Sequence, residues 1–236
     1  MTERPRILAI VPARGGSKRL PRKNLLALAG RPLINWTIDS ARNSGICDEV
    51  LVSTDDKDIA EIARDAGALV PWLRPADLAS DTASSAEVIA HALKWYEKER
   101  GTVDVVLLLQ PTSPFRSVAS IRGAVLIYAD QPGPRQHAVV SVSPAGSHPA
   151  WTFTCQGDEL KPCFGWEPLT QRSQDLPPAY ALNGAVYVIP AADARDALSI
   201  VRPGVLPYVM TSPRESLDID TEEDWAMALF WVNNRR

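Results

Sequence analysis

Positive charge is concentrated in one short segment near the N-terminus, directly after an apolar run. The run, Ile7–Pro12, is typical of a buried parallel strand. Residues 14–23 then contain two adjacent glycines and five cations: Gly15, Gly16, Arg14, Lys18, Arg19, Arg22 and Lys23. Glycines let backbone N–H groups approach a ligand closely, and the cations offset its negative charge. A loop of this kind after a first strand predicts binding of a polyanion, with a nucleoside triphosphate as the natural candidate.

Two familiar phosphate-binding motifs are absent from this loop. The P-loop requires G-x-x-x-x-G-K-[ST], whereas here Ser17 precedes Lys18. The dinucleotide motif requires G-x-G-x-x-G, but the two glycines are adjacent and position 19 is arginine. The alternative that the charges only solvate a surface loop stays open. The glycine pair, the cations and the strand occurring together favour the anion site.

Two carboxylates near the C-terminus have the spacing of a cation site. In an extended segment the side chains of Asp218 and Asp220 point to one face, and Mg²⁺ prefers one or two carboxylates completed by phosphate oxygens and waters. The alternative is that one aspartate caps a terminal helix beginning near Thr221. Beside a triphosphate loop, the metal interpretation is favoured. Asp55 and Asp56 are left out of the site, because adjacent side chains diverge in a strand and Asp56 suits a helix cap.

Uncharged polar side chains follow the most apolar run of the chain, residues 105–109. Gln110, Thr112 and Ser113 offer donors and acceptors suited to a hydroxyl or a base. The intervening Pro-Thr-Ser-Pro sequence is equally good turn chemistry. An Asn-Gly pair beginning at Asn183 leaves the same two options, since Asn-Gly is a strong hairpin-turn signal.

Strand-like and helix-like segments alternate over the first two thirds of the chain. This predicts an α/β fold with a Rossmann-like, mostly parallel sheet flanked by helices. The expected strands are 7–12, 50–54, 105–109, 138–142, 185–189 and 206–210, and the expected helices are 33–42, 59–66, 84–96, 117–129 and a terminal one. The span of about 144–178 is rich in proline and aromatic residues and lacks helical periodicity. We expect it to be an inserted lobe within a single domain of residues 1–236.

Bulk composition narrows the function classes. A length of 236 residues suits one α/β domain, and a net charge of −3 argues against nucleic-acid binding. Three cysteines without CxxC spacing indicate neither a zinc site nor a disulfide framework. No apolar stretch is long enough to span a membrane and no signal peptide is evident, so we expect a cytoplasmic protein without a membrane partner.

Five blocks along the chain together resemble one enzyme family. They are residues 10–24 (IVPARGGSKRLPRKN), 73–85 (LRPADLASDTASS), 109–114 (LQPTSP), 183–187 (NGAVY) and 216–221 (SLDIDT). In this order they resemble the blocks of the acylneuraminate (CMP-sialic acid) cytidylyltransferases, over nearly the whole chain. The resemblance implies a nucleotidyltransferase fold of GT-A-like type, CTP and a nonulosonic acid as substrates, and Mg²⁺ as cofactor.

The resemblance also implies roles for the residues that match these blocks. Arg14 and Lys23 are the implied catalytic cations, which bind the CTP phosphates. The implied nucleotide-binding residues are Ala13, Arg14, Gly15, Gly16, Lys23, Asn24, Ser84, Ser85 and Asn183, and which of the two serines serves is left open. The implied sugar-binding residues are Gln110, Thr112, Ser113 and Arg172, and the implied metal ligands are Asp218 and Asp220.

Departures from related enzymes bear on the acceptor. Synthetases for the eight-carbon sugar KDO open on a Tyr-Ala-Ser-Thr-like run and carry an acidic residue near the place of Gln110. This chain differs at both places, so a nine-carbon acceptor is expected, which leaves sialic, legionaminic and pseudaminic acids. Some sialic-acid enzymes have an arginine where this chain has Ala181, and Arg172 is the candidate replacement. The family's lobe before the Asn-Gly block mediates dimerisation, so a homodimer is expected.

The implied reaction is attack of the anomeric C2 hydroxyl of the acid on the α-phosphate of CTP, with pyrophosphate as the leaving group. Positioning and charge stabilisation dominate such transfers, and no side chain stands out as a general base. Two alternatives stay open. One is another sugar nucleotidyltransferase, such as one for KDO, and the other is a nucleotide- or sugar-binding protein without turnover.

Overall fold

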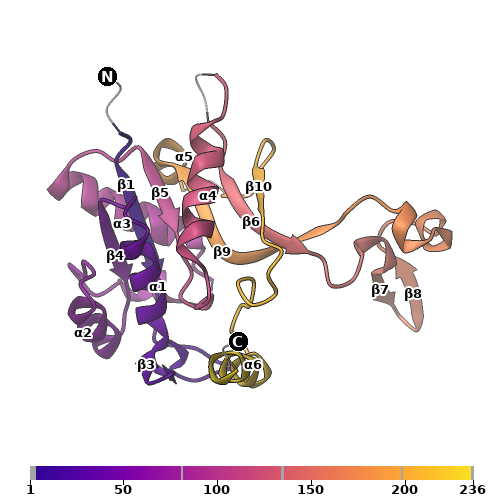
Figure 1. Ribbon diagram of the computed structural model, residues 1–236, viewed down its shortest axis with the longest axis horizontal. Helices are drawn as coiled ribbons and strands as arrows, with labels where there is room; N and C mark the ends of the chain where they lie inside the picture. The colour runs from indigo at the N-terminus through magenta and orange to yellow at the C-terminus, as the bar shows by residue number, and fades with distance from the viewer. Residues whose placement is uncertain (1–3, 81, 134–135, 198, 235–236) are drawn as a thin grey trace.

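A six-stranded sheet forms the centre of the computed structural model, which describes residues 4–80, 82–133, 136–197 and 199–234 (Figure 1). In spatial order its strands are β10 (Leu206–Val209), β6 (Val139–Pro144), β9 (Tyr180–Pro190), β5 (Val105–Leu108), β1 (Ile7–Pro12) and β4 (Glu49–Ser53). β1 pairs in parallel with β4 and β5, and β10 pairs in parallel with β6. β9 runs antiparallel to both of its neighbours. The expected mostly parallel sheet is confirmed.

Helices cover both faces of the sheet because strand residues alternate between two cores. The helices are α1 (Leu33–Asn43), α2 (Lys57–Asp65), α3 (Ser85–Arg100), α4 (Val118–Ala129), α5 (Ala191–Arg195) and α6 (Glu222–Asn233). In β1, Ala9 and Val11 belong to the core beneath α1, α2 and α4, whereas Leu8 and Ile10 belong to the core beneath α3 and α5. No helix among the described residues is both long and apolar enough to cross a membrane.

β9 is longer than expected and contains a bulge at the Asn-Gly pair. The pair lies inside the strand, so the hairpin-turn interpretation is wrong. Val140 of β6 is opposite Tyr187, whereas Val142 is opposite Leu182, so β9 has additional residues between these two pairs. Within the bulge Gly184 has a φ of 73°, a left-handed conformation that glycine adopts without strain.

The side chains of Ser141 and Asn183 replace backbone hydrogen bonds that the bulge interrupts. Ser141 Oγ donates to Asn183 Oδ1 (2.6 Å) and accepts from the N–H of Val186 (2.7 Å). Asn183 Oδ1 also accepts from the N–H of Ala185 (3.1 Å), and Asn183 Nδ2 donates to Ser143 Oγ (2.8 Å). The bulge is therefore a built feature of the sheet whose buried polar groups have partners.

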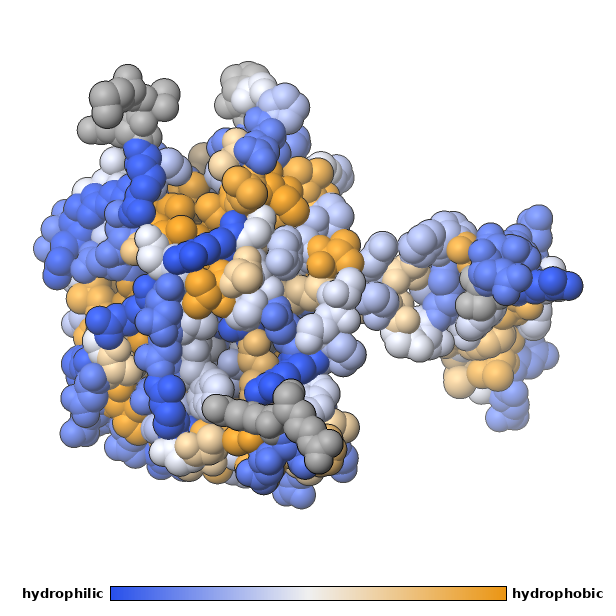
Figure 2. All heavy atoms as spheres, viewed as in Figure 1, coloured by the Kyte–Doolittle hydropathy of each residue, from blue (hydrophilic) through white to orange (hydrophobic). Residues whose placement is uncertain are grey.

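The chain between β6 and β9 forms a lobe that stands apart from the sheet (Figure 1; Figure 2). It contains the hairpin β7 (Phe153–Gln156) and β8 (Glu159–Pro162) and the 3₁₀ helices Pro149–Trp151, Glu167–Thr170 and Ser173–Asp175. Nearly all hairpin residues are exposed. The lobe covers the aromatic-rich span singled out in the sequence, and none of its residues with described side chains belongs to the two cores beneath the helices.

An aromatic cluster anchors the segment that precedes α6. Phe115 packs edge-on against Trp36 and Trp231, with 5.9 Å between ring centroids in both pairs. Ile219 is fully buried in the same cluster, which also includes Leu28 of the two-residue strand β2 (Ala27–Leu28), the partner of β3 (Arg31–Pro32). Because Ile219 is fixed, the aspartates on either side of it are held at the carboxyl edge of the sheet.

We predict that Ser141→Ala destabilises the protein by about 1–3 kcal/mol, because it leaves the buried N–H of Val186 without its partner. Ser143→Ala is the matched control: it removes one partner of Asn183 and leaves the other contacts intact, so its effect should be clearly smaller. Urea unfolding of both variants measures the difference. Equal stability losses would contradict the role given to Ser141.

Candidate active site

The carboxyl ends of β1 and β5 and the segment before α6 surround a cavity of about 470 Å³. The expected site residues that line it are Arg14, Lys23, Asn24, Ser85, Gln110, Thr112, Asp218 and Asp220. The remaining lining residues are Pro12, Arg19, Arg74, Leu78, Ser80, Ala83, Val88 and Pro111. The cavity thus occupies the place where open α/β sheets bind ligands.

Backbone contacts hold the basic loop against β4. Ala13 N–H donates to the last carbonyl of β4 (2.9 Å), and Gly15 N–H donates to the carboxylate of Asp55 (3.0 Å). A side chain at Gly15 would meet Asp56 at 2.7 Å, so this position requires glycine, whereas Gly16 has open space around it. These three loop residues do not line the cavity, and Asp56 is the expected cap of α2. Asp55, left out of the site, therefore positions the loop.

Asn24 lines the cavity and carries an acceptor without a hydrogen-bond partner. It is buried in a 3₁₀ turn, Lys23–Leu25, that ends the basic loop. Its Nδ2 donates to the carbonyl of Arg14 (3.1 Å), whereas its Oδ1 is buried without a hydrogen-bond partner. A buried amide oxygen without a partner is costly, and a ligand hydroxyl would satisfy it.

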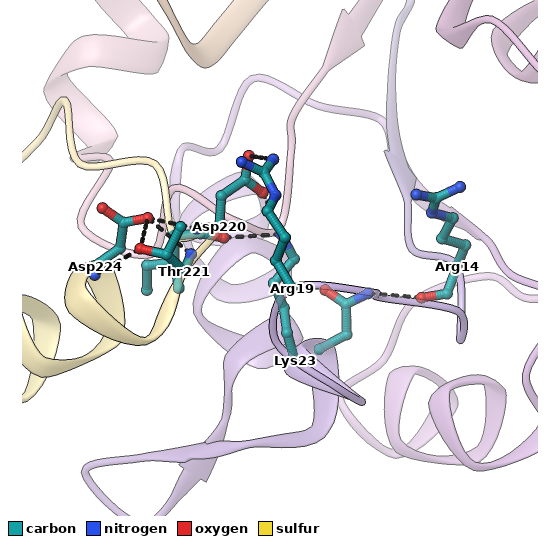
Figure 3. A network of polar contacts seen from close by, with 8 residues as sticks. Arg14, Arg19, Lys23, Asp220, Thr221 and Asp224 are labelled. Atoms are coloured by element: carbon teal, nitrogen blue, oxygen red, sulfur yellow. Dashed lines mark hydrogen bonds and ion pairs between the residues drawn. The ribbon is translucent and has the colours of Figure 1, made fainter. Parts of the chain in front are cut away.

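Asp220 joins two cations of the loop (Figure 3). Lys23 Nζ donates to Asp220 Oδ1 (2.6 Å) and to the carbonyl of Ile219 (2.8 Å). Arg19 pairs with Asp220 Oδ2 at 2.5 Å. Burial alone would raise the pKa of Asp220, but the hydrogen bond from Lys23 and the charges of Lys23 and Arg19 outweigh it and lower the pKa. The carboxylate is therefore held ionised beside the loop.

Asp218 has the opposite electrostatic environment. Burial raises its pKa, the charge of Asp220 adds to this effect, and a hydrogen bond from Thr112 opposes it. Asp218 Oδ1 is buried without a partner. A carboxylate in this state is stabilised by a cation, so the pair Asp218 and Asp220 fits a divalent ion. The described residues contain no cluster of three or more His, Cys, Asp and Glu, so such an ion would complete its shell from substrate and water.

The capping interpretation of these two aspartates is wrong. Thr221 is the N-cap of α6, where its Oγ1 accepts from the N–H of Asp224 (3.2 Å). The Asp224 carboxylate in turn accepts from the N–H of Thr221 (2.8 Å). This capping box (Figure 3) leaves the side chains of Asp218 and Asp220 to line the cavity.

The two candidate serines have different environments. Ser84 is the N-cap of α3: its Oγ accepts from the N–H of Glu87 (3.2 Å), and the Glu87 carboxylate accepts from the N–H of Ser84 (2.8 Å). Ser85 lines the main cavity and Ser84 does not. Ser85 is therefore the serine available to a ligand in the main cavity.

Gln110 lies at the edge of the bulge in β9. A side chain on Gly184 would meet Gln110 Oε1 at 2.5 Å, so the glycine makes room for this carboxamide. Thr112 lines the cavity and its carbonyl accepts from the N–H of Ile219 (2.8 Å). Ser113 is fully buried and does not line the cavity, so the structure does not support the contact with sugar expected for it.

Two further predicted ligands lie outside the main cavity. The amide of Asn183 makes hydrogen bonds within the bulge and does not line the main cavity, so its contact with the cytosine end stays a prediction. Arg172 is exposed and lies between two 3₁₀ helices of the lobe, Glu167–Thr170 and Ser173–Asp175. It does not line the cavity of its own chain, so it does not replace there the arginine missing at Ala181.

Arg74 is a cavity residue that the sequence analysis did not identify. Its Nε donates to Ser53 Oγ (3.1 Å), and its terminal nitrogens donate to the carbonyls of Ser53 and Leu78. Burial lowers the pKa of Arg74, and the nearby charge of Asp55 opposes this shift. The arginine of the LRPADLA block was the available signal in the sequence. It lines the cavity because it is buried beside Ser53, the last residue of β4.

A second cavity of about 410 Å³ adjoins the first, and Ser85 and Gln110 line both. Its other lining residues are mostly apolar: Ser84, Ala86, Leu108, Tyr187, Ala197, Ser199, Ile200 and Val201. Burial raises the pKa of the Tyr187 phenol, so its hydroxyl stays protonated at neutral pH. A charged ligand and a partly apolar one could thus lie side by side, with Gln110 between them.

We predict opposite stability effects for the two aspartates at pH 7.5 without metal. The folded pKa of Asp218 is raised above its ordinary 3.8, so its stabilising contribution is full only below that value and is lost as the pH rises through the folded pKa. Ionised Asp218 is then a cost, and Asp218→Asn should raise the Tm. The pKa of Asp220 is lowered, so its contribution is present at neutral pH and Asp220→Asn should lower the Tm.

Thermal unfolding in the presence of a chelator, from pH 3 to 8, checks both signs. The contribution of Asp220 should disappear as the pH falls through its lowered pKa. A fall in Tm of similar size for both variants at pH 7.5 would contradict the assigned environments.

Comparison with known proteins agrees with this geometry. Residues 8–148 match the family described as "Cytidylyltransferase". The CMP-N,N'-diacetyllegionaminic acid synthase of Legionella pneumophila is 43% identical, over 94% of this chain and 94% of that protein. A pseudaminic acid cytidylyltransferase of Campylobacter jejuni is 34% identical over 96% and 97%. An N-acylneuraminate cytidylyltransferase of Escherichia coli is 35% identical over 96% of this chain and 52% of that protein.

Similarity to solved structures supports the fold. CMP:2-keto-3-deoxy-manno-octonic acid synthetase in complex with CTP superimposes with a TM-score of 0.72 at 15% identity, covering 98% of this chain and all of that one. A 4-diphosphocytidyl-2C-methyl-D-erythritol synthase from Anaerococcus prevotii gives a TM-score of 0.66 at 13% identity, covering 98% and all of that chain. From the site, the matched residues and these relatives, we conclude that the chain belongs to the cytidylyltransferase family.

Proposed function

We propose that this protein transfers the cytidylyl group of CTP to the anomeric C2 hydroxyl of a nonulosonic acid and releases pyrophosphate. The observation that carries this proposal is the meeting of the loop cations with the two aspartates in one cavity, beside a second cavity of different chemistry. The named activities of the relatives support the choice of CTP and of a nonulosonic acid.

Arg14 and Lys23 bind the triphosphate in this mechanism. Both line the main cavity, and Lys23 is only 11% exposed, so its charge acts in a partly desolvated place. When CTP binds, Lys23 exchanges Asp220 for a phosphate oxygen and stabilises the charge that develops on the leaving pyrophosphate. The unpaired Oδ1 of Asn24 accepts from a hydroxyl of the nucleotide.

Asp218 and Asp220 hold a divalent ion, for which we propose Mg²⁺. Bound there, the ion would act as a Lewis acid on phosphate oxygens. The protein's part is to keep two carboxylates at the cavity, with Ile219 buried between them as the anchor. The unpaired oxygen of Asp218 supports this assignment. Arg19 and Lys23, which pair with Asp220, would have to give way to the ion.

The second cavity receives the acceptor. Its wall combines Tyr187 with the apolar side chains of Leu108, Ile200 and Val201. Such a wall suits a sugar acid that carries apolar acyl methyl groups, as the name of the Legionella relative describes for its product. We therefore propose an acid with two N-acyl groups as the preferred acceptor, with Gln110 at the junction with the nucleotide.

Pyrophosphate release tests the function. We expect release from CTP and Mg²⁺ with N,N'-diacetyllegionaminic acid, less with sialic or pseudaminic acid, and none with KDO. UTP, GTP and ATP should not replace CTP. Release with KDO as the best acceptor would identify a different synthetase, and CTP binding without turnover of any acid would favour a non-catalytic binding protein.

Lys23→Ala should lower turnover by roughly 10²–10³, the scale of losing one preorganised stabilising group. The matched control is Arg22→Asn, which removes a neighbouring charge of the same loop. Arg22 pairs with Asp58 and does not line the cavity, and asparagine tolerates its φ of 53°. Steady-state kinetics should separate the two variants by at least tenfold, and equal activities would remove Lys23 from the mechanism.

The lobe is the proposed contact between two copies of the chain. Phe153, Leu160, Phe164 and Trp166 are between 40% and 67% exposed on it, and Figure 2 shows apolar atoms grouped on one side of the lobe. Exposed aromatic groups of this kind are enriched at protein interfaces. They support a homodimer formed through the lobe.

Replacing both Phe164 and Trp166 with serine should convert the dimer to a monomer in sedimentation experiments at micromolar concentration. Both side chains are exposed in the single chain, so the Tm of the monomer should not fall through loss of its own core. Leu126→Ser, which removes an exposed apolar side chain from α4 in the body of the protein, is the control and should stay dimeric. A wild-type protein that sediments as a monomer would contradict the proposal.

A further inference from the structure

A buried arginine holds the end of β5. Arg116 is 3% exposed, and its Nη2 donates to the carbonyl of Gln110 (2.6 Å). Its Nε donates to the carbonyl of Ala185. Its Nη1 donates to the hydroxyls of Thr37 (3.3 Å) and Ser40 (3.5 Å). One guanidinium therefore connects the end of β5, the bulge of β9 and helix α1.

Arg116 acts where the strand ladder stops. The last paired residues of β5 and β9 are Leu108 and Tyr187. Beyond them the carbonyls of Gln110 and Ala185 both point at the guanidinium, which joins the strands in place of backbone hydrogen bonds. A planar fork with donors in several directions can serve both carbonyls at once, which a lysine ammonium on a flexible stem does not.

Burying the charged guanidinium of Arg116 costs desolvation free energy. No ion pair is formed between Arg116 and a carboxylate among the described residues. Burial lowers the pKa of Arg116 to about 9 and the charge of Asp218 opposes this shift, so Arg116 remains charged at neutral pH. An apolar side chain of similar volume would avoid the cost of desolvating a cation. An apolar side chain could not make the hydrogen bonds that fix the carbonyls of Gln110 and Ala185.

The residue fixed by this arrangement is Gln110, which lines both cavities. Its carbonyl accepts from Arg116 and, at 3.4 Å, from Thr37 Oγ1. Its side-chain oxygen lies against Gly184, where any larger residue would displace it. Gln110 is thus held at its backbone by Arg116, and the glycine of the bulge leaves room for its carboxamide.

We propose that Arg116 is a positioning residue for the acceptor: it fixes Gln110 at the junction of the two cavities, so that the acceptor hydroxyl is held against the nucleotide. This inference rests on the proposed function, because it assigns the acceptor to the second cavity. Arg116 itself lines neither cavity, so it is placed to act through Gln110.

A double-mutant cycle between Arg116 and Gln110 tests the proposal. Arg116→Lys should lower kcat/KM for the acceptor by about 10²-fold, the scale expected when a positioned group shifts by about 1 Å. The affinity for CTP alone should change by less than about threefold. Combined with Gln110→Ala, the lysine variant should add almost nothing, since both changes remove the same positioned group. Losses that multiply in the double variant would overturn the proposal.

Two measurements separate this role from a merely structural one. Calorimetric affinity for the acid in the presence of CMP needs no turnover and should show the same cycle. Arg122→Lys is the control: Arg122 Nε also donates to a backbone carbonyl, that of Ser44 (2.7 Å), but outside both cavities. It should leave kcat/KM unchanged. A similar kinetic loss in Arg122→Lys would assign the effect to general destabilisation and overturn the proposal.

If Arg116→Lys does not fold, Thr37→Val replaces it in the cycle, because it removes one donor to the Gln110 carbonyl without changing the side-chain volume greatly. Its loss should be smaller and should likewise vanish in the Gln110→Ala background. A wild-type protein that neither binds nor consumes any acid would refute the proposed function and this role together. Turnover by the wild type with independent effects of the two residues would refute this role alone.

Discussion

The ion pair between Lys23 and Asp220 is the contact on which the arrangement of the site depends. It joins the loop after β1 to the segment before α6, which are 197 residues apart in the sequence. Without a ligand, each group supplies the counter-charge that the other needs in a partly buried place. In the proposed function, a nucleotide with its metal ion would supply both counter-charges at once, phosphate to Lys23 and the cation to Asp220. The rest of the fold serves to bring these two segments to the same edge of the sheet.

Much of this arrangement could be predicted because it depends on local patterns. The apolar runs of β1 and β5 are buried on both faces and read as parallel strands, and parallel strands bring their carboxyl ends to one edge. The cations after β1 and the polar residues after β5 therefore had to meet. The paired aspartates carried their own signal in their spacing, and the capping box at Thr221 explains why neither is needed to begin α6.

The remaining site depends on partners that are distant in sequence. An Asn-Gly pair occurs both in hairpin turns and in bulges, so the local sequence does not distinguish them. Here Ser141, on the neighbouring strand β6, supports the bulge through its hydrogen bonds to Asn183 and Val186. Which of Ser84 and Ser85 lines the main cavity depends on where α3 begins. The Glu87 carboxylate fixes that point by accepting a hydrogen bond from the N–H of Ser84, the N-cap. Ser113 carries a hydroxyl that could bind a ligand, but it is fully buried and does not line the cavity, unlike its neighbour Thr112. Arg116 gave no signal, because an arginine in a polar turn usually faces solvent.

The lobe leaves and rejoins the sheet at directly opposed residues. Pro144 at the end of β6 is the partner of Tyr180 at the start of β9, and Ala145 N–H donates to the carbonyl of Ala179 (2.9 Å). Pairing of β6 with β9 therefore holds the two ends of the lobe together. Doubling the length of a segment whose ends are held in this way costs only about 0.6 kcal/mol in chain entropy. The lobe can therefore differ in length or sequence while β6 and β9 stay paired in the sheet. The contact surface proposed for the lobe could thus change while the residues around the cavity stay the same.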